Sequence, residues 1–350
     1  MRRLVKMLSL GLGVSLLATA CGSDNTATDP QGSTTTTSGT VRGGSLVVYS
    51  GRSEELVGPL IEKFEKASGV DVQVRYGDTA EMAAQILEEG DNSPADVFFG
   101  QDAGALGALG AQGRLIKLSA QQLDHVADGF KDDEGRWVGT SGRARVVVYN
   151  TDKLTEGDLP DSILDFTDPA WKGRIGWAPT NGSFQAFVTG LRVLKGESAA
   201  RAWLEGIKAN QPATFDGNSA IVEAVGAGEI EAGFVNHYYA IKLKAADPDL
   251  AVANKLFGGG DPGGLVNVAG GGILNTAKNT GQANAFIDFL LSNDAQKYFA
   301  ETTYEIPLVE SVQPAKGVPT IADLTVPDID LNRLDDLEGT LALLTELGIV

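Results

Sequence analysis

The stretch Ala232–Ala246, AGFVNHYYAIKLKAA, joins a short apolar run directly to a helical pattern. Its first part, Ala232–Val235, predicts a buried strand, and its last part, Ala240–Ala246, predicts the first turns of a helix. A strand that leads into a helix is the repeating unit of an α/β fold. In open α/β sheets, ligands bind beyond the carboxyl ends of the strands. The residues at this junction, Tyr238 and Tyr239, are therefore candidate ligand-binding residues.

The adjacent tyrosines are unusual because the chain has only seven tyrosines in all. At a strand-to-helix junction both phenols can turn to one side, whereas neighbouring side chains diverge within a regular element. Two convergent phenols suit a hard, highly charged cation, because phenolate is a hard oxygen donor. A free phenol ionises only near pH ~10, but a bound cation can displace its proton at neutral pH. The alternative is a pair of core or rim aromatics.

Strand and helix patterns alternate outward from this junction, which predicts an α/β fold without tandem repeats. The expected strands are 46–49, 70–74, 96–100, 146–149, 175–177, 232–235 and 270–274. The expected helices are 54–66, 103–110, 184–195, 199–208, 219–226, 240–246, 279–291 and 294–300, with one more that begins after a capping box of Asp78 and Glu81 and runs to about Leu87. The glycine run Gly258–Gly264 has no helix after it and is expected to be a loop.

The chain has 350 residues, 43% of them hydrophobic, which is enough for two α/β lobes with a cleft between them. Chains of this kind often pass between lobes more than once. We therefore expect an N-terminal lobe of 45–144 plus 269–319 and a C-terminal lobe of 145–268 plus 320–350.

The N-terminus resembles an export signal. Residues 1–20 combine a basic end, a short apolar stretch and a small-residue cleavage site. The only cysteine, Cys21, follows at once and has no disulfide partner. Leu17–Cys21 resembles a bacterial lipobox, so we expect Cys21 to be lipidated; plain secretion after Ala20 is the alternative. Residues 21–44 are then a flexible tether.

Composition argues against several other classes of protein. The net charge of -18 disfavours binding to nucleic acid or to anionic membrane surfaces. With two histidines, one cysteine and neither a nucleophile elbow nor a phosphate-binding loop, an exported enzyme is disfavoured as well.

Four clusters of small polar residues instead favour a captured ligand. They are Ser50–Glu54, Ala95–Asp102, Ser141–Asn150 and Trp177–Phe184. Each contains a small polar turn beside a strand or at the start of a helix, where free N–H groups bind anions well. Taken singly, each cluster is also an ordinary turn and cap.

Taken in order along the chain, the clusters resemble the ferric-ion-binding proteins of bacterial ABC iron importers. The most specific match is Asn236–Tyr239, followed by Ser141–Tyr149, the arginine-rich strand that ends in tyrosine. Further matching segments are Glu89–Phe98, Trp171–Gly176, Asn218–Ser219 and Asp261–Gly263. The resemblance covers residues 45 to 310 and implies a two-lobed type II periplasmic binding protein fold with a hinge and an interlobe cleft.

The resemblance also implies roles for particular residues. Tyr238 and Tyr239 match the paired phenolate ligands of Fe3+, and Tyr149 matches a third tyrosine ligand of several subgroups. Arg143 and Arg145 match a cleft position that holds carbonate or a similar anion, which suits the planar fork of a guanidinium. In other members, a shell of residues holds a companion anion such as phosphate. The positions of that shell match Asn181, Gly182, Ser183, Asn218 and Asn236.

Two positions depart from the best-known members of the family. Ser53, followed by Glu54, stands where those members carry a histidine. Gln101, followed by Asp102, stands where they carry a glutamate. Variants without the histidine or the glutamate exist in the family, and we expect these four residues in the cleft wall opposite the tyrosines. Glu54 is either a substitute carboxylate ligand or a charge at a helix N-terminus.

These patterns lead to one principal hypothesis and one alternative. The principal hypothesis is a monomeric, lipid-anchored receptor that captures Fe3+ with carbonate, phosphate or citrate and delivers it to an ABC permease and its ATPase. The alternative is a binding protein of the same fold for an oxyanion or a small organic solute.

Overall fold

The computed structural model describes residues 42–350, which belong to one compact unit. The expected export signal, Cys21 and nearly all of the expected tether lie outside the described residues. No helix within residues 42–350 combines the length and apolar character needed to cross a bilayer.

The described residues contain a mixed sheet with the strand order β2-β1-β3-β9-β4-β7-β5-β6. In the first half, β1, β2 and β3 are parallel, and β9 runs antiparallel to β3. Their bounds are β1 Ser45–Ser50, β2 Asp71–Tyr76, β3 Val97–Gly100 and β9 Val266–Ile273. The second half consists of β5 Ile175–Trp177, β6 Ala213–Thr214, β7 Ala232–Asn236 and β8 Val252–Lys255.

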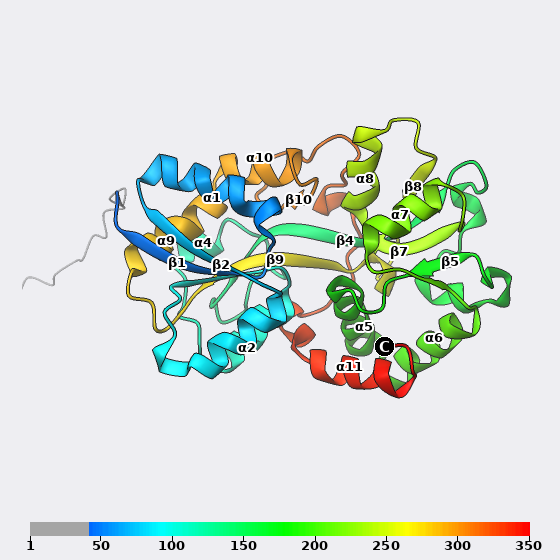
Figure 1. Cartoon of the computed structure of the whole chain (residues 1–350), viewed down its shortest axis with the longest axis horizontal. Coiled ribbons are helices and arrows are strands. Elements are labelled where there is room, and N and C mark those ends of the chain that lie inside the picture. Colours follow the sequence, from blue (N-terminus) through cyan, green and yellow to red (C-terminus); the bar gives the residue numbers. More distant parts are fainter. Residues whose placement is uncertain (1–41) are drawn as a thin grey trace, which may run out of the picture. The chain divides into compact units, whose positions relative to one another are not determined.

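One long strand, β4 (Val138–Asn150), belongs to both halves of the sheet (Figure 1). Its residues 138–144 pair with β9, and its residues 145–149 pair with β7. The short strand β10, Ile306–Pro307, joins β4 at Gly142 and Ser141. The chain therefore changes from one half to the other at Ala144 and Arg145.

Helices cover both faces of each half (Figure 1). In the first half these are α1 Glu54–Ser68, α2 Thr79–Glu89, α3 Ala103–Ala111, α4 Ala120–Leu123, α9 Thr280–Leu290 and α10 Asn293–Glu301. In the second half they are α5 Gly182–Lys195, α6 Glu197–Ala209, α7 Asn218–Gly226, α8 His237–Ala246 and α11 Leu337–Glu346. Among the short 3-10 segments are Leu331–Asp335, which packs on α3, and Pro262–Gly264, which lies in the glycine run that was expected to be a loop.

Separate hydrophobic cores lie in the two halves, as expected for two lobes. The first core combines buried residues of 46–144 with residues from 265 onward, up to Leu334. Two smaller clusters occupy the second half and include Leu343 and Leu344 of α11. The chain was expected to pass from the first lobe to the second at residue 320. It does so near residue 336, because Leu331 and Leu334 still pack on the first core.

Most expected elements are present, with three informative differences. Strand β4 begins eight residues before the expected 146–149, because its small and polar residues are buried against β9 and β10. The capping box at Asp78 does not form, since the Asp78 side chain makes no cap hydrogen bond. Helix α8 begins at His237, so the two tyrosines lie in its first turn.

Candidate metal and anion site

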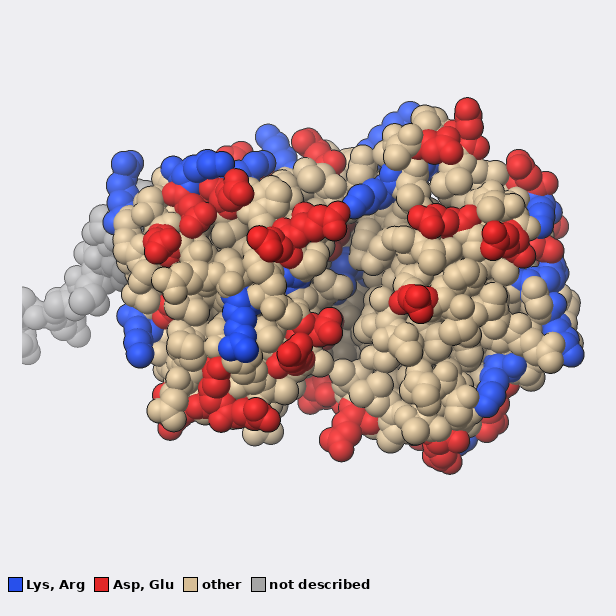
Figure 2. Space-filling view, viewed as in Figure 1, with Lys and Arg blue, Asp and Glu red and all other residues tan. Residues whose placement is uncertain are grey.

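A cleft of about 1590 Å³ lies where the two halves face each other, and residues of both halves line it. Figure 2 shows acidic side chains on both sides of this hollow. The acidic lining residues are Glu54, Glu55, Asp78, Glu81, Asp102, Glu223, Asp335 and Glu338, and the basic ones are Arg143 and Lys242. A rim with this excess of carboxylates attracts cations.

Tyr238 and Tyr239 both line the cleft. They follow Asn236, the last residue of β7, and their half-buried rings stack with centroids 4.3 Å apart at an interplanar angle of 28°. Neighbouring residues in mid-helix would point in directions about 100° apart. The first turn of α8 instead holds the two phenols side by side.

The phenol of Tyr238 is protonated at neutral pH. Burial raises the pKa of Tyr238 above its ordinary value of 10.0, and Tyr239 and Glu305 act in the same direction, whereas Arg143 opposes them. A cation that binds this phenolate must therefore displace a proton.

His237 precedes the pair but points away from the cleft. It is fully buried, its Nδ1 accepts the Ala144 N–H at 3.1 Å, and its Nε2 lies 3.0 Å from the Tyr304 carbonyl oxygen, to which it donates. Burial lowers the pKa of His237 to about 4. Both ring nitrogens are engaged, so His237 fixes the start of α8 against β4 and is not free to bind a ligand.

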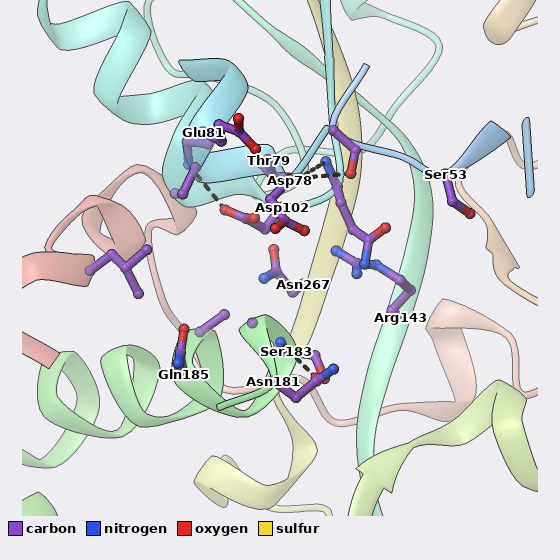
Figure 3. Close-up of a pocket in the computed structure, with 18 of the residues that line it drawn as sticks. Ser53, Asp78, Thr79, Glu81, Asp102, Arg143, Asn181, Ser183, Gln185 and Asn267 are labelled. Carbon is purple, nitrogen blue, oxygen red and sulfur yellow. Dashed lines mark hydrogen bonds between the residues drawn. The ribbon is translucent and has the colours of Figure 1, made fainter. Parts of the chain in front are cut away.

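Arg143 lines the cleft and is 3% exposed. Its Nε and Nη2 have no hydrogen-bond partner. Figure 3 shows its side chain beside β4, with Asp102, Asn267, Ser183 and Asn181 all lying to the left of it in this view. A nearly buried guanidinium with free N–H groups is an arrangement that favours an oxyanion.

Arg145 does not line the cleft, contrary to its expected role in direct anion binding. Its Nη2 donates to the Phe234 carbonyl oxygen at 2.9 Å, and its guanidinium lies 5.6 and 5.3 Å from the ring centroids of Phe184 and Phe187. Burial lowers the pKa of Arg145 to about 9, while Tyr239 and Tyr238 oppose this shift. Arg145 therefore supplies a buried positive charge behind the tyrosine pair.

A polar cluster surrounds the N-terminus of α5. The Asn181 Oδ1 accepts from the Ser183 N–H at 3.0 Å and from the Ser183 hydroxyl at 2.6 Å. Asn218 Nδ2 donates to Asn181 Oδ1 at 3.3 Å and to Ser183 Oγ at 3.1 Å. Asn181, Gly182 and Ser183 line the cleft, whereas Asn218 and Asn236 lie behind it and are buried. Three of the five residues expected to hold the anion therefore line the cleft, and two do not.

The four expected residues of the opposite wall all line the cleft. Ser53 is the residue before α1 and makes no cap hydrogen bond with its side chain, and Glu54 is in the first turn of α1. Asp102 caps α3 by accepting the Ala105 N–H at 3.0 Å. Gln101 is half-buried, and its backbone N–H donates to Thr79 Oγ1 at 3.2 Å. Figure 3 shows Ser53 and Asp102 on this wall.

Tyr149 does not lie at the cleft, which corrects its expected role as a third metal ligand. The antiparallel register pairs Arg145 with Asn236 but Tyr149 with Ala232. Four residues of strand separate those levels, which is about 14 Å. Tyr149 instead packs in the core of the second half and is 7% exposed.

Other residues at the site had no recognisable signal in the sequence. Asn267 of β9 lines the cleft beside Arg143, and its Oδ1 accepts the Ala103 N–H at 3.1 Å. Thr303 lines it as well, next to the buried Glu305. Both come from segments distant in sequence, so only the pairing of β9 and β10 with β4 could have revealed them. Within residues 42–350, no group of three or more His, Cys, Asp and Glu side chains could hold a metal.

The fold and the cleft are those of a family of binding proteins. Residues 59–325 match the model of the bacterial extracellular solute-binding proteins, and the chain belongs to that family. It is 35% identical over 309 residues to the Fe(3+)-binding periplasmic protein of Serratia marcescens, covering 87% of this chain and 90% of the relative. It is also 35% identical over 311 residues to the major ferric iron-binding protein of Neisseria meningitidis, with coverage of 87% and 93%.

Solved structures agree with this assignment. Iron-bound HitA from Pseudomonas aeruginosa superposes with a TM-score of 0.81 at 33% identity, covering 87% of this chain and 99% of that one. Trichodesmium IdiA (FutA), solved with iron and citrate ligands, superposes with a TM-score of 0.74 at 29% identity, covering 87% and 99%. The resemblance indicated by the sequence motifs and the type II periplasmic binding protein fold are both confirmed.

Proposed function

We propose that this protein is an extracytoplasmic receptor that captures Fe3+ through the phenolates of Tyr238 and Tyr239, together with a companion anion. The observation that carries the proposal is the stacked tyrosine pair in the cleft, in a chain 35% identical to proteins named as ferric-iron-binding. The protein then delivers the ion to an ABC permease energised by its ATPase. It acts as a binding protein and not as an enzyme.

The surroundings of the tyrosines support phenolate ligation. The guanidinium of Arg143 faces the cleft and that of Arg145 lies behind the pair, and both favour the ionised phenol. The N-terminus of α8 adds a partial positive charge at the same place. The acidic rim concentrates cations near the cleft.

Two phenolates alone leave a six-coordinate ferric ion with open positions and a net positive charge. The free N–H groups of Arg143 and the polar cluster at Asn181, Gly182 and Ser183 are suited to an oxyanion that fills those positions. Carbonate, phosphate and citrate all have the required chemistry, and the relative IdiA was solved with citrate. Ser53, Glu54, Gln101 and Asp102 are the candidates for any ligand from the opposite wall.

The alternative is a receptor of the same fold for an oxyanion or a small organic solute. The free guanidinium of Arg143 is the observation in its favour, since it fits an anion with or without a metal. The two functions differ in colour. Tyrosinate bound to Fe3+ gives a visible charge-transfer band, whereas an oxyanion alone gives none.

The test uses the purified chain without its N-terminal signal, stripped of metal and supplied with a soluble ferric chelate. The expected result is a red to orange band at one iron per chain. The double variant Tyr238→Phe and Tyr239→Phe should lose the band but keep its fold, because phenylalanine preserves the ring volume.

Tyr149→Phe is the matched control, because it removes a phenol that lies outside the cleft. It should keep the full band. Retained colour in the double variant would overturn phenolate ligation by the pair, and loss of colour in Tyr149→Phe would restore Tyr149 as a ligand.

A further inference from the structure

Beneath the floor of the cleft lies a buried ion cluster of Arg52, Glu305 and Arg143. Arg52 is 0% exposed, Glu305 is 1% exposed and Arg143 is 3% exposed. Arg52 and Glu305 do not line the cleft, whereas Arg143 does. Arg52 lies in the turn after β1, Arg143 lies in β4 and Glu305 is the residue before β10. The fold therefore brings them together from distant parts of the chain.

The carboxylate of Glu305 is paired with the guanidinium of Arg52. The Arg52 Nη2 donates to both oxygens of Glu305, at 3.0 and 2.8 Å, and Thr303 Oγ1 donates to the same carboxylate at 2.9 Å. Arg52 is held in turn by Ser141, whose Oγ accepts from Nη1 at 3.1 Å, and by the ring of Phe99, 5.5 Å from its guanidinium carbon. This pair is therefore fixed in place on both sides.

Arg143 lacks a comparable partner. Its Nε lies 4.0 Å from Glu305 Oε1, which is too far for a hydrogen bond. Glu305 is the one carboxylate within that distance of Arg143 among residues 42–350. Burial alone would raise the pKa of Glu305, but Arg52 and Arg143 hold it below its ordinary value, so the carboxylate is ionised. Two guanidinium groups thus share a single negative charge.

The cluster consequently has one positive charge that no carboxylate in the cluster balances. Arg143 carries this charge, and Arg143 lines the cleft. An unpaired buried charge is costly, and an anion in the cleft would remove that cost. The same guanidinium would be neutralised from behind if Glu305 were free to pair with it. We propose that Arg52 is a positioning residue that sets the affinity of the cleft for its oxyanion, because it occupies Glu305 and so keeps Arg143 available.

This inference rests on the companion anion of the proposed function, and it makes a prediction that an ordinary structural salt bridge does not make. Loss of the Arg52 charge should free Glu305 for Arg143 and weaken anion binding. Loss of the Glu305 charge should leave Arg143 fully unpaired and strengthen anion binding. A pair that only supports the fold would weaken binding from either side.

The experiment measures the bicarbonate concentration that gives half of the ferric charge-transfer band, with Fe3+ supplied by a weak chelator in carbonate-free buffer. Relative to the unaltered protein, Arg52→Gln should raise this concentration about tenfold, and Glu305→Gln should lower it by a similar factor. The half-saturating bicarbonate concentration of the double variant should lie within about threefold of that of the unaltered protein, because Arg143 then again carries one uncompensated charge.

Arg52→Lys is the conservative control, since it keeps a positive charge beside Glu305 and should stay within about threefold of the unaltered protein. Circular dichroism checks the fold of each variant, and Thr303→Val, which removes one hydrogen bond to Glu305, replaces any variant that does not fold. It should raise the half-saturating concentration by less than Arg52→Gln does, since it loosens Glu305 towards Arg143 without changing any charge.

The outcomes separate this inference from the proposed function. If the unaltered protein gives no band, iron capture itself is wrong. If the band forms with a bicarbonate requirement but Arg52→Gln and Glu305→Gln shift it in the same direction, the positioning role of Arg52 is wrong and iron capture stands. The positioning role is equally wrong if Thr303→Val lowers the bicarbonate requirement.

Discussion

At the scale of single residues, Arg143 and Arg145 show how two arginines on one strand can differ in role. Arg143 lines the cleft and has two N–H groups without a hydrogen-bond partner, whereas Arg145 packs against the rings of Phe184 and Phe187 and does not line the cleft. Replacing Arg143 by glutamine should raise the bicarbonate requirement for the ferric band at least about tenfold, because a hydrogen bond to a charged group contributes roughly 1.5–3 kcal/mol. Absorption titration measures this.

Ser53→Ala is the control for that experiment, since it removes a hydroxyl from the opposite wall without changing a charge. It should leave the bicarbonate requirement within about threefold. An Arg143→Gln variant that needs no more bicarbonate than Ser53→Ala would show that Arg143 does not hold the anion. A full ferric band in the unaltered protein without any added anion would show that the protein supplies the remaining iron ligands itself. Glu54 and Asp102 would then be the better candidates for those ligands.

His237 gives a second prediction at this scale, for the iron-free protein. Burial lowers its pKa to about 4, below the ordinary value of 6.5, so the folded state resists the proton that the unfolded chain accepts. This contribution to stability is fully present above pH 6.5 and is lost as the pH falls from 6.5 towards 4. The loss amounts to about 3 kcal/mol.

Urea unfolding at pH 7 and pH 4.5 tests the role of His237. His237→Gln should be less stable than the unaltered protein at pH 7 but should lose about 2–3 kcal/mol less between the two pH values. His125→Gln, at an exposed position, should leave the pH dependence as it is. An unchanged pH dependence in His237→Gln would mean that folding does not lower the pKa of His237.

At the scale of secondary-structure elements, the local spacing of apolar residues predicted most helices and strands, but it could not predict how the strands pair. Apolar spacing located β1, α1 and β7, because each buries one face or is buried throughout. It missed α11, a helix whose apolar residues pack on α5 and α6, far away in the sequence. The family resemblance implied that Tyr149 lies at the cleft. The pairing of β4 with β7 instead places Tyr149 opposite Ala232, four residues along the strand from Asn236, and this register cannot be read from one strand alone.

Helix α3 gives a prediction about packing between elements. Its glycines allow the backbone of Leu331–Asp335 to lie directly on the helix: a Cβ at Gly104 would overlap the Leu334 carbonyl, and one at Gly107 would lie 3.0 Å from the Asn332 oxygen. Trp137 Nε1 also donates to Asn332 Oδ1 at 2.8 Å. Gly104→Ala should destabilise the iron-free protein by about 1–3 kcal/mol, measured as a lower thermal midpoint.

Gly157→Ala is the matched control, because its new Cβ would meet only the Thr155 side chain at 3.9 Å. It should change stability by less than about 0.5 kcal/mol. Equal midpoints for the two variants would mean that the C-terminal segment can shift away from α3 without loss.

At the scale of the whole molecule, we propose that the protein is attached to the membrane through Cys21, which lies outside the described residues. Leu17–Cys21 resembles a bacterial lipobox, so we expect a lipid on this cysteine to supply the anchor. Cys21→Ser should move nearly all of the protein from the membrane fraction to the soluble fraction of exporting cells, as measured by immunoblotting. Equal membrane retention in both forms would show that the lipobox interpretation is wrong.

The cleft itself gives the last prediction, which concerns closure of the two halves on iron. Carboxylates line it from both sides, with Glu54, Asp78 and Glu81 on the first half and Glu223 and Glu338 on the second. Like charges across the cleft disfavour closure in the absence of a cation. A ferric ion held by the tyrosines removes part of this repulsion and brings the opposite wall within reach of the ligand.

Small-angle scattering should therefore give a smaller radius of gyration with iron than without it. The double variant Tyr238→Phe and Tyr239→Phe should show no change on addition of the same ferric chelate, because it keeps the charged rim but lacks the phenolates. Strand β4, the segment that leads into β9 and the segment Leu334–Leu337 all cross between the halves, so we expect the motion to be a rotation about these crossings. Identical profiles from a protein with its ferric band fully developed would show that iron binds without closure.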